Sequence, residues 1–208
     1  VKDAAVAATV FKAGKTEGSH CKVCGKVLRK QASVAKLKPT ISLTASSLKM
    51  KAGQSTTVFK AAGLAKGDYV TKVTSGNTGI VKVSSVTKKG TFRLTAGKKA
   101  GSTTVKVILA SKKSASFKVT VQRGVVKTSK ITVSTKSVTL KKGTTYRKLA
   151  SSVKVTPVTS QEKVTYTSSN KKIVTVTSGG VIKGLKKGNA TITIRSGSKR
   201  TTCKVTVK

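Results

Sequence analysis

An internal repeat constrains the fold of this sequence more than any other feature. The stretch from Ile41 to Gly53 aligns without a gap with the stretch from Ile131 to Gly143. Three shorter blocks follow in the same order in both copies: Thr74–Val83 with Thr167–Val176, Ala100–Val107 with Lys187–Ile194, and Phe117–Val121 with Cys203–Val207. Matching blocks in one order predict that the chain contains the same folding unit twice.

Each block has the pattern of strands and turns. Hydrophobic residues alternate with polar ones, as at Val105 and Val107, and this period of two is typical of strands with one buried face. Glycines such as Gly101 and Gly188 separate the runs as turns. About seven short strands per copy predict an all-β chain of two tandem immunoglobulin-like β-sandwiches. We expect residues 1–38 to form a small N-terminal β/loop module with a Cys-x-x-Cys motif, and residues 39–122 and 123–208 to form the two sandwiches.

The second copy carries a family pattern in Ser168–Asn170, Ile173–Val176, Gly180–Ile182 and Ala190–Ile192. This pattern resembles the group 2 bacterial immunoglobulin-like domain. In the first copy, Lys88–Phe92 stands where that family has a Gly-Val-Val hairpin, so its strand register is expected to depart there. The stretch Ala13–Leu28 resembles short Cys-x-x-Cys modules in surface proteins of anaerobic Gram-positive bacteria.

These resemblances imply an extracellular protein associated with the Gram-positive cell wall, acting as a spacer or adhesin stalk. Because the sequence begins with Val1 and not Met, we expect a segment of a longer chain, monomeric within it.

The net charge of the chain is unusual. The sequence contains 44 Lys and Arg residues but only 4 Asp and Glu residues, which gives a net charge of +40. Arg occurs at few positions, and Lys is a hydrated point charge without the bidentate fork of Arg, so the surface predicts diffuse attraction to polyanions. Aromatic residues make up only 3% of the chain, which leaves few platforms for stacking bases, so no specific nucleic-acid site is expected. No apolar run approaches the ~20 residues that span a bilayer, so no membrane insertion is expected.

The inventory of catalytic residue types predicts that the protein is not an enzyme. The acids Asp3, Glu17, Asp68 and Glu162 are scattered, His20 is the single histidine, and no nucleophile elbow or phosphate loop occurs. We interpret the acids as isolated surface charges, too few and too dispersed for a calcium site. No cofactor is expected.

Cysteines form the one suggestive cluster. His20, Cys21 and Cys24 look like half of a zinc knuckle and are weak metal candidates, because structural zinc takes four ligands. A Cys21–Cys24 disulfide or a free dithiol is favoured, since exported chains meet oxidants; redox catalysis is a third alternative. Cys203 takes the place of Phe117 in the repeat, which predicts a buried thiol.

Two functions remain open. The first is an extracellular cell-surface structural stalk or adhesin segment. The alternative is a binding module whose sandwich face engages a host surface or serum protein, or an anionic cell-wall or mucosal glycan. Asn77, Asn170 and Asn189 lie among lysines, where turn formation is favoured over intramolecular isopeptide bonds.

Overall fold

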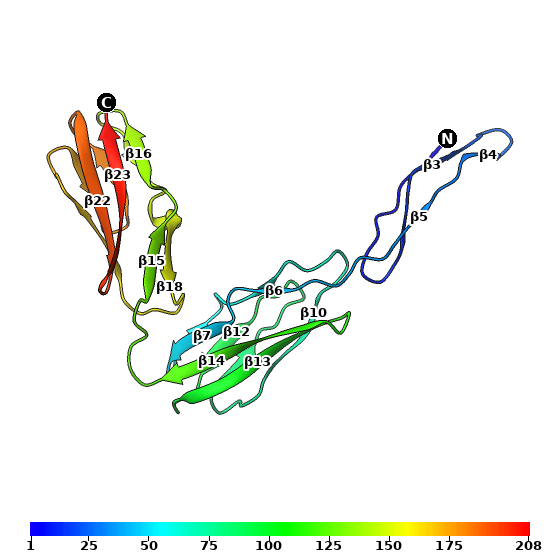
Figure 1. Cartoon of the computed structure of the whole chain (residues 1–208), viewed down its shortest axis with the longest axis horizontal. Coiled ribbons are helices and arrows are strands. Elements are labelled where there is room, and N and C mark those ends of the chain that lie inside the picture. Colours follow the sequence, from blue (N-terminus) through cyan, green and yellow to red (C-terminus); the bar gives the residue numbers. More distant parts are fainter. The chain divides into compact units, whose positions relative to one another are not determined.

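The structure, a computed structural model, describes the whole chain, residues 1–208 (Figure 1). It consists of β-strands and one 3-10 turn, η1 (Ala150–Ser152), without an α-helix. Contacts divide it into two compact units, Val1–Ser47 with Ala52–Val121, and Gln122–Lys208 with Leu48–Lys51. The predicted fold class, two tandem immunoglobulin-like sandwiches with a small N-terminal β/loop module, is confirmed.

The N-terminal module is made of very short strands. Its three-stranded sheet has the order β1-β3-β4, with β1 (Lys2–Asp3), β3 (Gly18–His20) and β4 (Val27–Arg29). Beside it, β2 (Gly14–Lys15) pairs with β5 (Ser33–Val34). Val27 and Leu28 on β4 are 62% and 67% exposed. Strands this short bury little apolar surface, so the module has no substantial core.

The first sandwich places its longest strands in one sheet. In that sheet β13 (Gly101–Leu109) lies between β10 (Val70–Ser75) and β14 (Ser114–Gln122). The opposite sheet has the order β11-β12-β8, with β11 (Val81–Ser84), β12 (Arg93–Ala96) and β8 (Ser55–Thr56). A fourth strand, β7 (Ser47–Lys51), completes the first of these sheets in the order β10-β13-β14-β7. Separately, β6 (Ser42–Leu43) pairs with β9 (Ala61–Ala62).

The second sandwich repeats this plan. One sheet has the order β16-β23-β22-β19, with β16 (Ser137–Leu140), β23 (Lys199–Val207), β22 (Gly188–Ser196) and β19 (Val164–Ser168). The other has the order β17-β21-β20, with β17 (Thr145–Tyr146), β21 (Ile182–Gly184) and β20 (Val174–Val176). A further pair joins β15 (Lys130–Val133) to β18 (Val153–Thr156). The orange and red arrows of Figure 1 are the β22–β23 hairpin, and β16 runs parallel to β23.

The two interiors differ in chemistry. In the first sandwich, the Phe59 and Phe117 rings stack with centroids 3.9 Å apart, and Phe92 lies 6.2 Å from Phe117. The second interior is aliphatic apart from a fully buried cysteine, Cys203, and includes Leu149, Ile182 and Ile192. The second sandwich therefore has an aliphatic core, whereas the first has an aromatic centre.

The copies also differ between their sixth and seventh strands. The connection from β11 to β12 spans residues 85–92, whereas that from β20 to β21 spans 177–181. The longer connection contains Lys88–Phe92, the stretch at which the first copy departs from the family pattern. The extra residues end in Phe92, whose buried ring fills the first core.

Candidate functional sites

The turn between β3 and β4 positions the two cysteines of the N-terminal module. The Cys21 N–H donates to the Lys26 carbonyl at 2.8 Å, and the Gly25 N–H donates to the Cys21 carbonyl at 3.0 Å. Gly25 has a φ of +70°, which glycine adopts without steric cost. These bonds close a tight loop that carries both thiols, with Cys24 exposed and Cys21 half-buried.

The same turn activates Cys21. Hydrogen bonds from the Cys24 backbone, then from the Cys24 thiol and the Val23 backbone, hold the pKa of Cys21 below its usual value. They do so because they stabilise the negative thiolate. Both thiols are free in this structure. The alternative of a Cys21–Cys24 disulfide remains a prediction.

His20 contacts a carboxylate at this site. Its Nδ1 lies 2.8 Å from Asp3 Oδ1, an ion pair when the imidazole is protonated. No group of three or more His, Cys, Asp or Glu side chains gathers anywhere in residues 1–208 in a way that could hold a metal ion. The chain thus supplies two adjacent thiols at the turn, and the nearby histidine is engaged with Asp3.

Cys203 lies in the second core, as its place in the repeat predicted. It stands opposite Ile192 in the β22–β23 ladder, just as Phe117 stands opposite Val105 in β13–β14. Its side chain is fully buried. Burial raises the pKa of the Cys203 thiol, and the positive charge of Lys136 opposes this in part. The thiol is therefore poorly suited to nucleophilic chemistry.

Besides Asp3, which pairs with His20, two more acids that sequence reasoning treated as isolated surface charges have specific structural partners, Asp68 and Glu162, so that interpretation is wrong for all three. Asp68 accepts hydrogen bonds from the Ser111 hydroxyl at 2.6 Å, and from the backbone N–H groups of Tyr69 at 3.0 Å and Ser111 at 3.2 Å. Glu162 Oε2 accepts the Thr128 N–H at 2.6 Å. Each acid lies two residues before a strand, β10 or β19, and that shared position is the sequence signal that could have revealed them.

The asparagines lie in turns or on a strand surface. Asn77 Oδ1 accepts the Gly79 N–H and Asn170 Oδ1 accepts the Lys172 N–H, both at 3.0 Å. Asn189 Oδ1 accepts the Thr206 hydroxyl at 2.9 Å. The first two are Asx turns, the arrangement that the sequence favoured over isopeptide chemistry.

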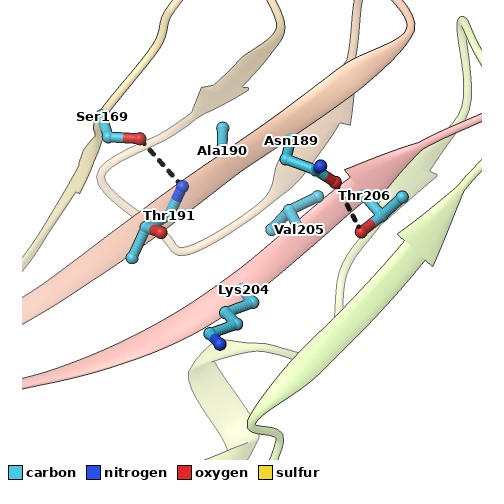
Figure 2. Close-up of a pocket in the computed structure, with 7 residues that line it drawn as sticks. All are labelled: Ser169, Asn189, Ala190, Thr191, Lys204, Val205 and Thr206. Carbon is cyan, nitrogen blue, oxygen red and sulfur yellow. Dashed lines mark hydrogen bonds between the residues drawn. The ribbon is translucent and has the colours of Figure 1, made fainter.

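A shallow polar groove lies over the β22–β23 hairpin of the second sandwich (Figure 2). Its volume is about 450 Å³, and its lining residues are Ser169, Asn189, Ala190, Thr191, Lys204, Val205 and Thr206. Thr191 and Lys204 are direct partners in the ladder. Ser169 Oγ accepts the Thr191 N–H at 2.9 Å and so fixes one wall.

The first sandwich repeats the central pair of this surface. Thr104 and Lys118 are partners in the β13–β14 ladder, as Thr191 and Lys204 are in β22–β23. The Ser102 and Thr120 hydroxyls lie 3.1 Å apart, in the place of the Asn189–Thr206 contact. Lysine ammonium, hydroxyl and amide groups on such a surface suit an anionic or polyhydroxylated ligand, and its openness suits weak binding.

Paired sheets with this strand order, present twice, define the class as a tandem immunoglobulin-like β-sandwich protein. More narrowly, residues 127–207 match the family model described as bacterial Ig-like domain (group 2). The resemblance of the second copy to that family is therefore confirmed.

Solved structures give partial likenesses. Domains 5–6 of the S-layer protein SbsC are 22% identical, with 81% of this chain and 96% of that chain covered and a TM-score of 0.40. Extracellular cadherin domains 1–4 of protocadherin gamma B7 are 11% identical, with 95% and 57% covered and a TM-score of 0.37. A comparison with curated proteins returned no match. The structure has no helix long and apolar enough to cross a membrane.

Proposed function

We propose that this chain is a structural segment of an extracellular, wall-associated surface protein of a Gram-positive bacterium, a stalk or adhesin shaft without catalytic activity. The observation that carries the proposal is that one sandwich plan occurs twice in succession in the same chain. Repetition of a closed domain adds length without adding chemistry. We also propose domain boundaries at residues 1–38, 39–122 and 123–208.

The placement of the ionisable groups supports this proposal. Asp68 and Glu162 accept hydrogen bonds from the backbone, and Asp3 faces His20. General acid–base catalysis needs a group free to exchange a proton with a substrate, and these three acids are engaged in contacts within the protein. The lysine-rich outer faces suit a location beside an anionic cell wall and disfavour edge-to-edge pairing of sheets.

A salt series tests the stalk proposal. We expect the chain to bind heparin, DNA or teichoic acid at low ionic strength, and to lose most of that affinity near 0.15 M salt, where the Debye length is about 8 Å. Titration against host serum and mucosal proteins in the same series is the companion measurement. Submicromolar binding of a single partner that persists at 0.15 M salt would make the chain a dedicated receptor.

The β22–β23 groove favours a second candidate function, a binding module for an anionic cell-wall or mucosal glycan. Lys204 would contact the anionic group, with the Thr191 hydroxyl and the Asn189 amide beside it. The repeated Thr104–Lys118 pair would add a second contact point on the same chain. Two weak sites on one chain raise the avidity for a repeating polyanion.

Replacing Lys204 by Ala tests this candidate. If the groove binds, the variant loses at least several-fold more affinity for teichoic acid or heparin than Lys199→Ala, its control at the hairpin turn. Equal losses in the two variants would show that only total charge matters, and would leave the stalk as the function.

A further inference from the structure

The β3–β4 turn has the form of a metal-binding turn but only half of its ligands. Both thiols emerge from one loop that is closed by the Cys21–Lys26 and Gly25–Cys21 backbone bonds. The Cys-x-x-Cys spacing of these two thiols is that of the ligand pairs in structural zinc sites.

The missing ligands are not supplied by the chain itself. Structural zinc takes four ligands, commonly all cysteine. No third ligand gathers near Cys21 and Cys24, because His20 faces Asp3 and Cys203 is enclosed in the core of the second sandwich. A complete site at this turn therefore needs two ligands from another molecule.

The surroundings of the turn favour a second copy as that molecule. Val23 at the tip is 95% exposed, and Val27 and Leu28 on the adjoining strand are also mostly exposed. This is apolar surface with nothing to cover it in the single chain. The module also lacks a core of its own, and small domains of that kind are commonly held by a metal or by association.

Charge balance favours the same arrangement. Four thiolates and one Zn²⁺ carry a net charge of −2. Lys22 lies between the two cysteines and Lys26 lies two residues after Cys24, so two copies bring four ammonium groups to the site. A tetrathiolate centre is therefore compensated, whereas two metal-free turns would repel each other through these lysines.

We propose that the Cys21–Cys24 turns of two copies of this chain bind one zinc ion between them through four thiolates. In forming the site, four S–H bonds are lost and four Zn–S bonds form; the four protons pass to solvent, and nothing is oxidised or reduced. The chain would thus be a monomer without metal and a dimer with zinc. This goes beyond the stalk function, because it links two chains at their N-terminal modules.

Zinc titration of the whole chain tests this proposal, with the thiols kept reduced by a phosphine. We expect binding to saturate at half a zinc ion per chain, with a doubling of mass in sedimentation equilibrium that a chelator reverses. Co²⁺ in place of zinc should give the intense sulfur-to-metal band and the visible bands of a tetrahedral thiolate centre.

Variants locate the site. Cys24→Ser should abolish both metal binding and dimerisation, while Cys203→Ala should keep both; circular dichroism checks that each variant is folded. Val23→Ser should keep the metal stoichiometry but weaken the dimer. The proposal is overturned by one zinc per chain on a monomer, by no binding to the reduced protein, or by binding that Cys24→Ser leaves intact.

Discussion

At the scale of single residues, the two sandwiches solve the same packing problem with different side chains. The first core is centred on the Phe59–Phe117 stack, with Phe92 alongside. In the second, Cys203 stands in the place of Phe117, and aliphatic residues such as Leu149 and Ile194 surround it. The two cores are therefore filled by different side chains, although the strands that carry these side chains have the same arrangement in both sandwiches.

Truncating Phe117 to Ala should destabilise the first sandwich by roughly 3–5 kcal/mol, the usual loss for a buried aromatic ring with its cavity. Urea unfolding followed by circular dichroism measures the change. Phe11→Ala is the matched control, because that ring is 44% exposed and its loss should cost far less. Similar losses from both variants would contradict the described core.

The thiols should differ sharply in reactivity. The pKa of Cys21 is lowered by its hydrogen bonds and that of Cys203 is raised by burial, so near neutral pH the thiolate fraction is larger at Cys21. After reduction, mass-resolved alkylation of the native protein should modify Cys21 first. Cys203 should react only once denaturant is added. Ready labelling of native Cys203 would contradict its placement on the core side of β23.

At the scale of elements, each sandwich has one acidic residue, Asp68 or Glu162, that contacts the turn of the last hairpin. Asp68, just before β10, binds Ser111 in the turn between β13 and β14. Glu162, just before β19, packs its carboxylate against Gly197 in the turn between β22 and β23, where a side chain on that glycine would clash. Both contacts tie a strand entrance to the turn of a neighbouring hairpin in the same sheet.

Replacing Asp68 by Ala should therefore lower the free energy of unfolding of the first sandwich by roughly 1–3 kcal/mol, because donors of the Ser111 turn lose a charged acceptor. Thermal unfolding monitored by circular dichroism measures the loss. Glu17→Ala, at an exposed position of the N-terminal module, is the control and should have little effect. Asp68→Asn should be intermediate, since the amide oxygen still accepts. If Asp68→Ala matches Glu17→Ala, the contact contributes nothing to stability.

Strands and their faces could be predicted from the sequence, but the acid contacts could not. Alternation at Val105 and Val107, or at Val205 and Val207, reports which side chains face a core, because the strand period is two. It does not report which turn lies beside Asp68, since that depends on how the sheet brings distant segments together. Likewise, the spacing of Cys21 and Cys24 indicated a paired site. It gave no sign that His20 would face Asp3.

At the scale of the whole molecule, charge dominates the solution behaviour. Four carboxylates cannot neutralise 44 basic side chains, so most lysines face solvent without an acidic partner. Their mutual repulsion opposes the compact state and is screened by salt. This repulsion lowers the free energy of unfolding, and hydrophobic burial and backbone hydrogen bonds between strands offset it.

We accordingly expect the melting temperature to rise with sodium chloride, from about 10 mM to about 0.3 M, as the Debye length falls from roughly 30 Å to below 8 Å. Differential scanning calorimetry measures this. Chloride is preferred to sulfate, because sulfate also strengthens burial by exclusion from the surface. A constant or falling melting temperature would show that the lysines do not destabilise the fold.

The parallel pairing of β16 with β23 has a mechanical consequence. In the second sandwich, β16 lies near the start of the domain and β23 forms its end, and Ser137–Leu140 run in the same direction as Lys204–Val207. Tension applied to the two ends of the domain pulls such a pair in opposite directions along its length. The hydrogen bonds between these strands are then loaded together in shear, and are not peeled apart one at a time. The proposed stalk function would place the chain under tension. A strand pair whose hydrogen bonds must all break together resists such tension better than one that opens bond by bond.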